Sequence, residues 1–237
     1  MGTAPRTSAP PPDGNQPTGL QDGLVLSYLG LRKAIGIIGL MLPFLLAIGN
    51  LFAQPLLRDP KPLAGLQDSI SYYYYTDMGN IFVGSLCAIG IFLLSYRGYE
   101  KQDRIAGILA CIFAVGVALF PTKPEVADPT MVDKVLGGLH YGFAALLFLT
   151  LAYFSLKLFT KTDPTKIPTQ QKLKRNIVYR VAGYTIVACI VLILVFKLTL
   201  SDDALHRFKP TFFLEALAVI AFGASWLVKG EAILKDE

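Results

Sequence analysis

The chain has 237 residues, of which 53% are hydrophobic and 16% are charged, and its formal net charge is +5. Soluble domains carry about 25% charged residues, so this composition excludes an ordinary soluble domain and indicates a lipid-facing surface. The basic residues form no clustered face of the nucleic-acid-binding kind, and we expect no nucleic-acid partner.

The first 30 residues are rich in Pro, Gly, Thr and Asn and contain no apolar region of signal-peptide type. They offer too little apolar surface to offset the entropy of ordering them. We therefore expect residues 1–30 to form a disordered cytoplasmic tail.

Six apolar runs follow this tail. A helix needs about 20 residues to cross roughly 30 Å of hydrocarbon, because each residue rises about 1.5 Å. Strands of a membrane β-barrel alternate apolar and polar residues, whereas a run such as 186–196 is continuously apolar. The sequence predicts an all-α integral membrane bundle of six transmembrane helices within residues 31–230, with spans at about 32–53, 77–96, 104–121, 138–159, 177–200 and 210–228.

The basic residues predict the orientation of this bundle. Of the 22 Lys and Arg, 15 lie in the tail, in the loops after the second and fourth spans, at the C-terminus or at the adjoining helix ends, and 7 lie on the other side. Short cytoplasmic loops are enriched in Lys and Arg, so both termini, including residues 231–237, are expected in the cytoplasm. The run from Lys157 to Arg180 is interpreted as such topogenic charge rather than as a specific site for anionic lipid.

The longest outer loop is expected from Gln54 to Thr76, because Pro55, Pro60 and Pro62 should stop the first helix. Four consecutive tyrosines, Tyr72 to Tyr75, precede the second span. Aromatic residues gather at membrane interfaces, which explains most of this run, although one or two hydroxyls could line an outer pocket.

Ionisable residues inside spans are costly and are functional candidates. Glu215 lies about five residues into the sixth span, so we expect it to face the bundle. His140 begins the fourth span and could act as a proton acceptor, a metal ligand or a headgroup contact. The sequence shows no HxxxH or HExxH spacing, and Cys87, Cys111 and Cys189 have no metal-ligand spacing, so we predict no metal site. Near the loop histidine His206, the carboxylates of Asp202 and Asp203 are interpreted as solvated.

Further polar residues lie at a similar depth on the first two spans. Asp77, Asn80 and Gly84 are spaced to share one helix face, and Asn50 lies near the outer end of the first span. The coincidence predicts an outward-facing polar pocket for a small molecule, a lipid headgroup or a proton, with the ligand-binding candidates Asn50, Tyr75, Asp77, Asn80, His140 and Glu215.

Two other functional classes stay open at this point. One is a membrane-embedded, lipid-directed hydrolase with His140 as its base and Asp77 or Glu215 as partner. The other is a structural or partner-binding protein in which the polar residues only hold helices together. Membrane lipids are expected partners in every case, and no cofactor is predicted.

Small residues let membrane helices approach closely, and Gly138 and Gly142 form a GxxxG pattern at the start of the fourth span. Gly36 with Gly39 is a looser pair of the same kind. Packing within the bundle is the favoured role of Gly138 and Gly142, and homodimerisation is the alternative.

The segment Ser69–Gly84, with Tyr96-Arg-Gly, Leu139-His-Tyr and Phe222–Gly230, resembles a group of uncharacterised bacterial six-pass membrane proteins over residues 30 to 235. This resemblance implies a multi-pass protein of the bacterial plasma membrane. A more distant similarity is to the CREST superfamily, whose ceramidases and receptors hold zinc through a Ser-x-x-x-His motif, an Asp and paired histidines. Here Ser71 is followed by Tyr75 in place of that histidine, so the resemblance carries no metal ligand to this chain.

Overall fold

The protein is described by a computed structural model covering residues 19–57, 65–96, 100–126, 128–162, 165 and 167–234, with side chains described from residue 27 and not for 53–57. No strand occurs in these ranges, which confirms the all-α prediction. The elements, in chain order, are α1 (Gly19–Leu57), η1 (Ser71–Tyr75), α2 (Gly79–Leu94), α3 (Lys101–Leu119), α4 (Met131–Tyr153), the π-helical turn η2 (Phe154–Leu158), α5 (Gln170–Thr199), α6 (Asp202–Phe208) and α7 (Pro210–Lys229).

Five described helices are long and apolar enough to cross a membrane: α1, α3, α4 together with η2, α5 and α7. The second predicted span is shorter than expected, because α2 has 16 residues. At about 1.5 Å per residue its helical part is roughly 24 Å long. Part of the stretch predicted as helix is instead a turn, and the short 3₁₀ helix η1 lies immediately before it.

Several helices are longer than predicted, because they extend beyond the apolar runs. The backbone of α1 is already helical at Gly19, inside the stretch predicted to be a disordered tail, and it continues to Leu57, past Pro55. Residues 1–18 lie outside the described part. A proline in the last turn removes only one backbone hydrogen bond, so it did not stop the helix. At the start of α4, Thr130 and Asp133 form a capping box that begins the helix seven residues before the predicted 138.

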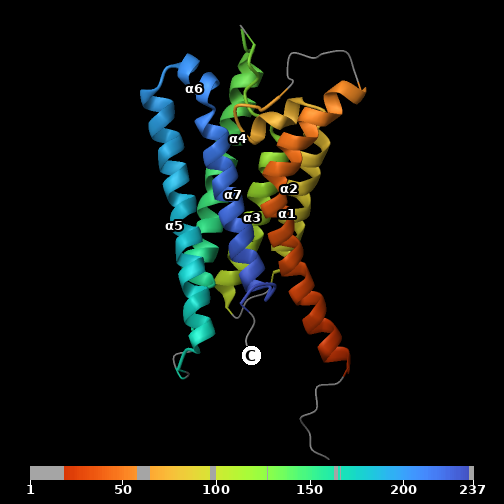
Figure 1. The fold of residues 1–237 in the computed structure, drawn as a ribbon, viewed down its shortest axis with the longest axis vertical. Coiled ribbons are helices and arrows are strands. Elements are labelled where there is room, and N and C mark those ends of the chain that lie inside the picture. The colour runs from red at the N-terminus through yellow and green to blue at the C-terminus, as the bar shows by residue number, and fades with distance from the viewer. Residues whose placement is uncertain are drawn as a thin grey trace, which may run out of the picture.

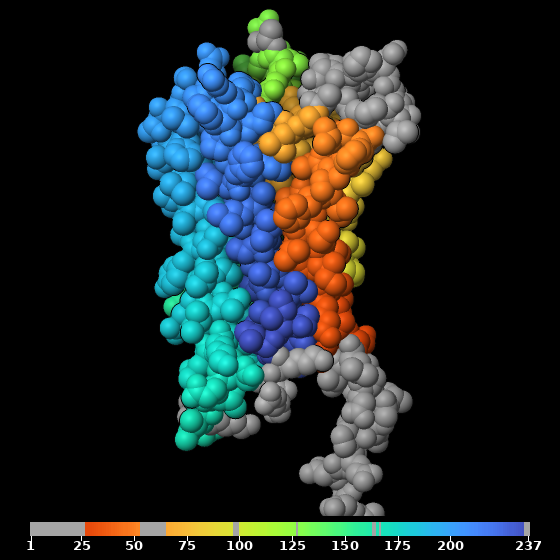
Figure 2. Space-filling model, in the orientation of Figure 1, coloured from red at the N-terminus to blue at the C-terminus, as the bar shows by residue number. Residues whose placement is uncertain are grey.

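The six long helices form a closed ring in the order α1, α2, α3, α4, α5, α7 (Figure 1). Consecutive helices are neighbours, as their short connections predict, and α7 closes the ring between α5 and α1. Figure 2 shows α7 between these two helices on one face of the molecule. We call the end formed by η1, residues 120–126 and α6 the α6 end. The opposite end, where α1 begins and α7 ends, is called the terminal end.

The crossing of α1 and α7 depends on glycines. A Cβ atom on Gly223 would lie 2.6 Å from the backbone nitrogen of Leu40 and 2.7 Å from the carbonyl oxygen of Gly36. A Cβ on Gly36 would lie 2.8 Å from the nitrogen of Leu227. The two backbones therefore touch directly, as small residues permit in membrane helices.

Gly138 and Gly142 behave differently. Both are exposed, and an added Cβ would meet no other atom within 4 Å at either position. Their predicted role in packing the bundle interior is therefore wrong, because their face of α4 points away from the neighbouring helices. A homodimer through this face stays a prediction.

The outside of the ring is apolar. Only 22% of the most apolar stretch of α5 is buried inside the bundle, and side chains such as Leu194 and Leu198 are exposed. Apolar surface of this extent is stable against lipid or another apolar partner and not against water. The structure is thus compatible with a multi-pass membrane protein.

Candidate functional site

Two irregular segments, residues 65–78 and 120–126, cover the α6 end of the bundle. Four of the six predicted site residues bind backbone groups of these segments: Asn50, His140 and Glu215 from the long helices, and Tyr75 from within the first segment. These four residues, which the sequence predicts at a similar depth, thus make their contacts at the α6 end. Their observed contacts, however, are with the protein's own loops.

Asn50 and Glu215 hold the first segment. Asn50, which is fully buried, donates from Nδ2 to the carbonyl oxygen of Gly65 at 2.8 Å. Glu215 on α7 accepts the backbone N–H of Ile70 at 2.7 Å through Oε2, immediately before η1. The first N–H groups of a helix have no partner within that helix, so a carboxylate at the start of η1 can satisfy one of them.

Tyr75 and His140 hold the second segment. The Tyr75 hydroxyl donates to the carbonyl oxygen of Thr122 at 2.5 Å. Burial raises the pKa of this hydroxyl to about 12, so it remains a donor at neutral pH. His140 is 1% exposed, and its Nδ1 lies 2.6 Å from the carbonyl oxygen of Phe120. A carbonyl can only accept, so Nδ1 carries the proton in this bond.

The remaining two predicted residues lie elsewhere. Asp77 is half-buried in the turn before α2, and Asn80 is exposed in the first turn of that helix. Gly84, on the same face, is exposed as well. Since Asn80 and Gly84 are both exposed, this face of α2 points to the outside of the ring. The six predicted residues therefore do not line one common cavity, and only Glu215 lines any of the cavities found among the described residues.

The cavity that Glu215 lines is small and lies inside the ring. It has a volume of about 50 Å³, and its walls are apolar side chains such as Leu42, Phe82 and Phe222. Ser71 and Glu215 are its polar residues, and the carboxylate of Glu215 is already bonded to the start of η1. This cavity has room for little more than a few water molecules or a small apolar group.

A larger and polar cavity opens at the α6 end. Its volume is about 540 Å³, and residues from both irregular segments, α4, α5, α6 and the start of α7 line it. Hydroxyl groups line part of it. The charged residues in its lining are Asp68, Glu125, Asp202, Lys123, Lys197 and His206. A cavity with both signs of charge suits a polar or zwitterionic molecule more than an apolar one.

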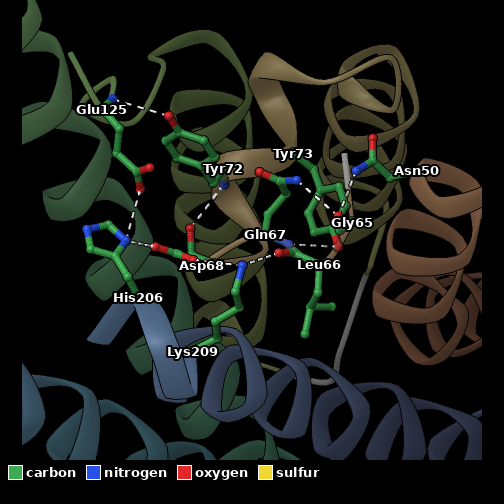
Figure 3. A network of polar contacts seen from close by, with 11 residues as sticks. Asn50, Gly65, Leu66, Gln67, Asp68, Tyr72, Tyr73, Glu125, His206 and Lys209 are labelled. Carbon is green, nitrogen blue, oxygen red and sulfur yellow. Dashed lines mark hydrogen bonds and ion pairs between the residues drawn. The ribbon is translucent and has the colours of Figure 1, made fainter. Parts of the chain in front are cut away.

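A cluster of charges forms one wall of this cavity (Figure 3). Nδ1 of His206 on α6 is bonded to Oδ2 of Asp68 and lies 4.0 Å from Oε1 of Glu125. Lys209, just before α7, places Nζ 3.0 Å from the other oxygen of Asp68 and also donates to the carbonyl of Leu66. Two loops and the α6 segment are joined here by alternating charges.

The carboxylates tune the ionisation of this cluster. The hydrogen bond that His206 donates to Asp68 raises the pKa of His206, so the imidazole keeps its proton to higher pH than usual. Burial, followed by the nearby charge of Asp68, raises the pKa of Glu125. Both shifts favour the protonated forms.

The same three side chains could hold a metal ion. One ligand atom from each of Asp68, Glu125 and His206 lies within 4.8 Å of the others. Two carboxylates and an imidazole suit a divalent transition metal. The ammonium of Lys209 already supplies positive charge to Asp68, however, and the pair needs no ion to be neutral. Asp203, which the sequence placed near His206, is not in this group, and Asp68 and Glu125 take its place.

The cluster predicts a pH dependence of stability. A histidine whose folded-state pKa is raised stabilises the fold fully below its unfolded pKa, near 6.5, and this contribution is lost as pH rises through the folded value. The raised pKa of Glu125 has an effect of the same sign: its contribution to stability is also lost as the pH rises, but at lower pH. We expect a loss of up to about 1 kcal/mol on going from about pH 6 to pH 9, because exposed pairs are weak.

Thermal unfolding of the purified protein across this range measures the effect, with His206→Gln compared against Asp203→Asn, an exposed control on the same helix. The histidine variant should lose this step in the pH profile, and the control should keep it. Equal profiles for wild type and His206→Gln would contradict the expectation.

Comparison of the chain with known protein families, with characterised proteins and with solved structures gives no match.

Proposed function

We propose that this protein is a six-pass protein of the bacterial plasma membrane that binds a small polar molecule or a lipid headgroup in the open cavity at the α6 end. Both termini lie in the cytoplasm in this proposal, because 15 of the 22 basic residues belong to that side. The α6 end then faces outward.

In this proposal α2 also crosses the membrane, in addition to the five longer helices. Its ring position between α1 and α3 is supported by contacts with both helices. A helix shorter than the hydrocarbon layer is accommodated by local thinning of the bilayer at modest cost. The number of passes is then even, which agrees with placing both termini on one side.

The observation that carries the binding proposal is the polar cavity of about 540 Å³, which is formed in part by the two loops. Asn50, Glu215, Tyr75 and His140 hold these loops through hydrogen bonds to their backbone, so the cavity exists without a ligand and needs little reorganisation to bind one. Lys197 provides positive charge, and the cluster around Asp68 provides groups of both signs. A zwitterionic or phosphate-containing headgroup fits these charges, and His206 provides a group that can exchange a proton.

We expect water-soluble headgroup analogues, such as glycerophosphoethanolamine, to raise the unfolding temperature of the purified protein. Lys197→Gln should weaken this binding about tenfold or more, because hydrogen bonds to charged groups contribute about 1.5–3 kcal/mol. Lys134→Gln, an exposed charge change on α4 that does not line the cavity, is the matched control. The proposal fails if no such analogue stabilises the protein, or if both variants respond as wild type does.

The hydrolase considered above receives no support from the geometry. Its proposed base, His140, is bonded to the carbonyl of Phe120 and not to Asp77 or Glu215. A structural role for the buried polar residues is supported by the four backbone contacts that they make. That role and ligand binding are compatible, since the anchors shape the cavity without lining it, Glu215 lining only the internal one.

A further inference from the structure

The polar cavity at the α6 end is lined by a set of hydrogen-bond donors as well as by the charged cluster around Asp68. Tyr72 from η1, Tyr141 from α4 and Lys197 from the last turn of α5 line the cavity together with residues 122–126. Each of the three side chains ends in a group that can donate a hydrogen bond. We call them the donor set. What they can bind depends on which of their protons the protein already uses.

The two tyrosine hydroxyls of the donor set act as acceptors within the protein. The backbone N–H of Glu125 donates to the Tyr72 hydroxyl at 3.2 Å (Figure 3). Oγ1 of Thr122 donates to the Tyr141 hydroxyl, also at 3.2 Å. A phenol hydroxyl has one proton to donate, and neither tyrosine donates its proton to any group in the described part of the chain. Both protons are therefore available to an acceptor in the cavity, beside the same loop.

The burial of Tyr72 gives independent support. Its side chain is only 7% exposed, although the residue lines the cavity. Burial raises the pKa of this hydroxyl, so it keeps its proton at neutral pH. A buried hydroxyl whose proton has no protein acceptor is costly, and a ligand that accepts this proton removes the cost. The ligand is thus expected to present acceptor atoms to Tyr72.

Lys197 adds positive charge to the donor set. Its ammonium lies 4.3 Å from the centre of the Tyr141 ring. Its charge also acts on the buried carboxylate of Glu215, but the two groups form no ion pair in the part of the chain that the structure describes. An ammonium and two hydroxyl protons favour a ligand group that is negatively charged and rich in oxygen. A phosphate presents three strong acceptor oxygens, whereas a carboxylate presents two in one plane.

The carboxylates that line the cavity oppose such a ligand only weakly. Asp68 is bonded to His206 and lies 3.0 Å from the ammonium of Lys209. The Glu125 carboxylate lies 4.0 Å from Nδ1 of the same histidine (Figure 3). Asp202, the third carboxylate of the lining, is exposed to water, which screens its charge. Two of the three acids therefore have basic partners, and the third is solvated.

We propose that Tyr72, Tyr141 and Lys197 bind a phosphate group, supplied either by a phospholipid headgroup or by a free phosphate ester. This inference rests on the proposed function, because it concerns the same cavity. It adds which group of the ligand is recognised and which side chains recognise it.

The test uses probes that differ only in the phosphate group, with the full-length protein purified in a neutral detergent. Thermal unfolding is followed with glycerol phosphate against glycerol, and with phosphoethanolamine against ethanolamine, at equal ionic strength. We expect the phosphate-containing probe of each pair to raise the unfolding temperature and the other to have no effect. Glycerophosphoethanolamine is then compared with glycerol phosphate. Tighter binding of the diester assigns the site to a lipid headgroup, and tighter binding of the monoester assigns it to a free phosphate ester.

Tyr141→Phe and Tyr72→Phe each remove a hydroxyl and keep the ring. Each should weaken binding of the phosphate-containing probe about tenfold or more, because a hydrogen bond to a charged group is lost. Tyr184→Phe, the same change at an exposed tyrosine on α5 that does not line the cavity, is the matched control and should bind as wild type does. If Tyr72→Phe does not fold, Tyr141→Phe decides the question.

The results separate the phosphate site from the cavity itself. Equal protection by ethanolamine and phosphoethanolamine, or unchanged phosphate binding in both Phe variants, would overturn the phosphate site and leave ligand binding in the cavity in place. Protection by none of the probes would overturn both proposals.

Discussion

Replacing Glu215 by Ala is expected to lower the free energy of unfolding by about 2–3 kcal/mol. The carboxylate accepts the N–H of Ile70 at the start of η1, and Ile70 is buried. Removing the carboxylate leaves this donor without its acceptor beside an apolar cavity, and a hydrogen bond to a charged group contributes about 1.5–3 kcal/mol. Reversible unfolding of the purified protein measures the loss.

Glu215→Gln is the matched control, because its amide oxygen can still accept the N–H of Ile70. We expect it to lose less stability than Glu215→Ala. Hydrogen exchange should show faster exchange at Ile70 in the Ala variant, while α3, which is not a neighbour of α7 in the ring, should be unchanged. An Ala variant as stable as wild type would show that Glu215 does not anchor η1.

Replacing Gly223 by Val is expected to have an effect of similar size, about 3 kcal/mol. A Cβ at this position would lie 2.6 Å from the backbone of Leu40, and backbone atoms cannot rotate away as a side chain can. The two helices must separate, and overpacking of this kind costs about 1–3 kcal/mol or more. Because α7 joins α1 to α5, their separation opens the ring.

Gly142→Val provides the control for this change. An added Cβ there meets nothing within 4 Å, so the stability of the monomer should change by less than about 0.5 kcal/mol. Equal losses in both variants would mean that glycine acts through chain flexibility and not through close contact. Chemical cross-linking of Gly142→Val in the membrane also tests the proposed homodimer, since a branched side chain would disrupt a glycine interface.

Much of the architecture could be predicted from the sequence because hydrophobic length is a local property. Five of the six apolar runs are helices long enough to cross a bilayer, and the remaining one, the second along the chain, is the shorter α2. The missed element, α6, has a local signal as well: Ser201 caps it, and Asp202 and Asp203 favour its start. Its seven residues are too few to produce an apolar face that a pattern search would notice.

The candidate site was less predictable. Depth along a helix follows from counting residues, so the sequence predicts a similar depth for Asn50, His140 and Glu215, and in the structure they contact the loops of the α6 end. Their partners are backbone groups of loops, and a backbone group has no sequence signature. The charged wall of the polar cavity joins Asp68, Glu125 and His206, which belong to three separate segments and share no spacing.

The sequence by itself determined the helical class, the apolar lengths and the uneven distribution of basic residues, because each depends on residues close together in the chain. The tertiary structure alone decided which glycines lie against a neighbouring backbone, which polar groups have hydrogen-bond partners and which charged side chains lie close together. Gly36 and Gly142 look alike in the sequence, yet one lies against a backbone and the other faces outward. That difference depends on the rotation of each helix about its axis, which is set by packing against all its neighbours at once.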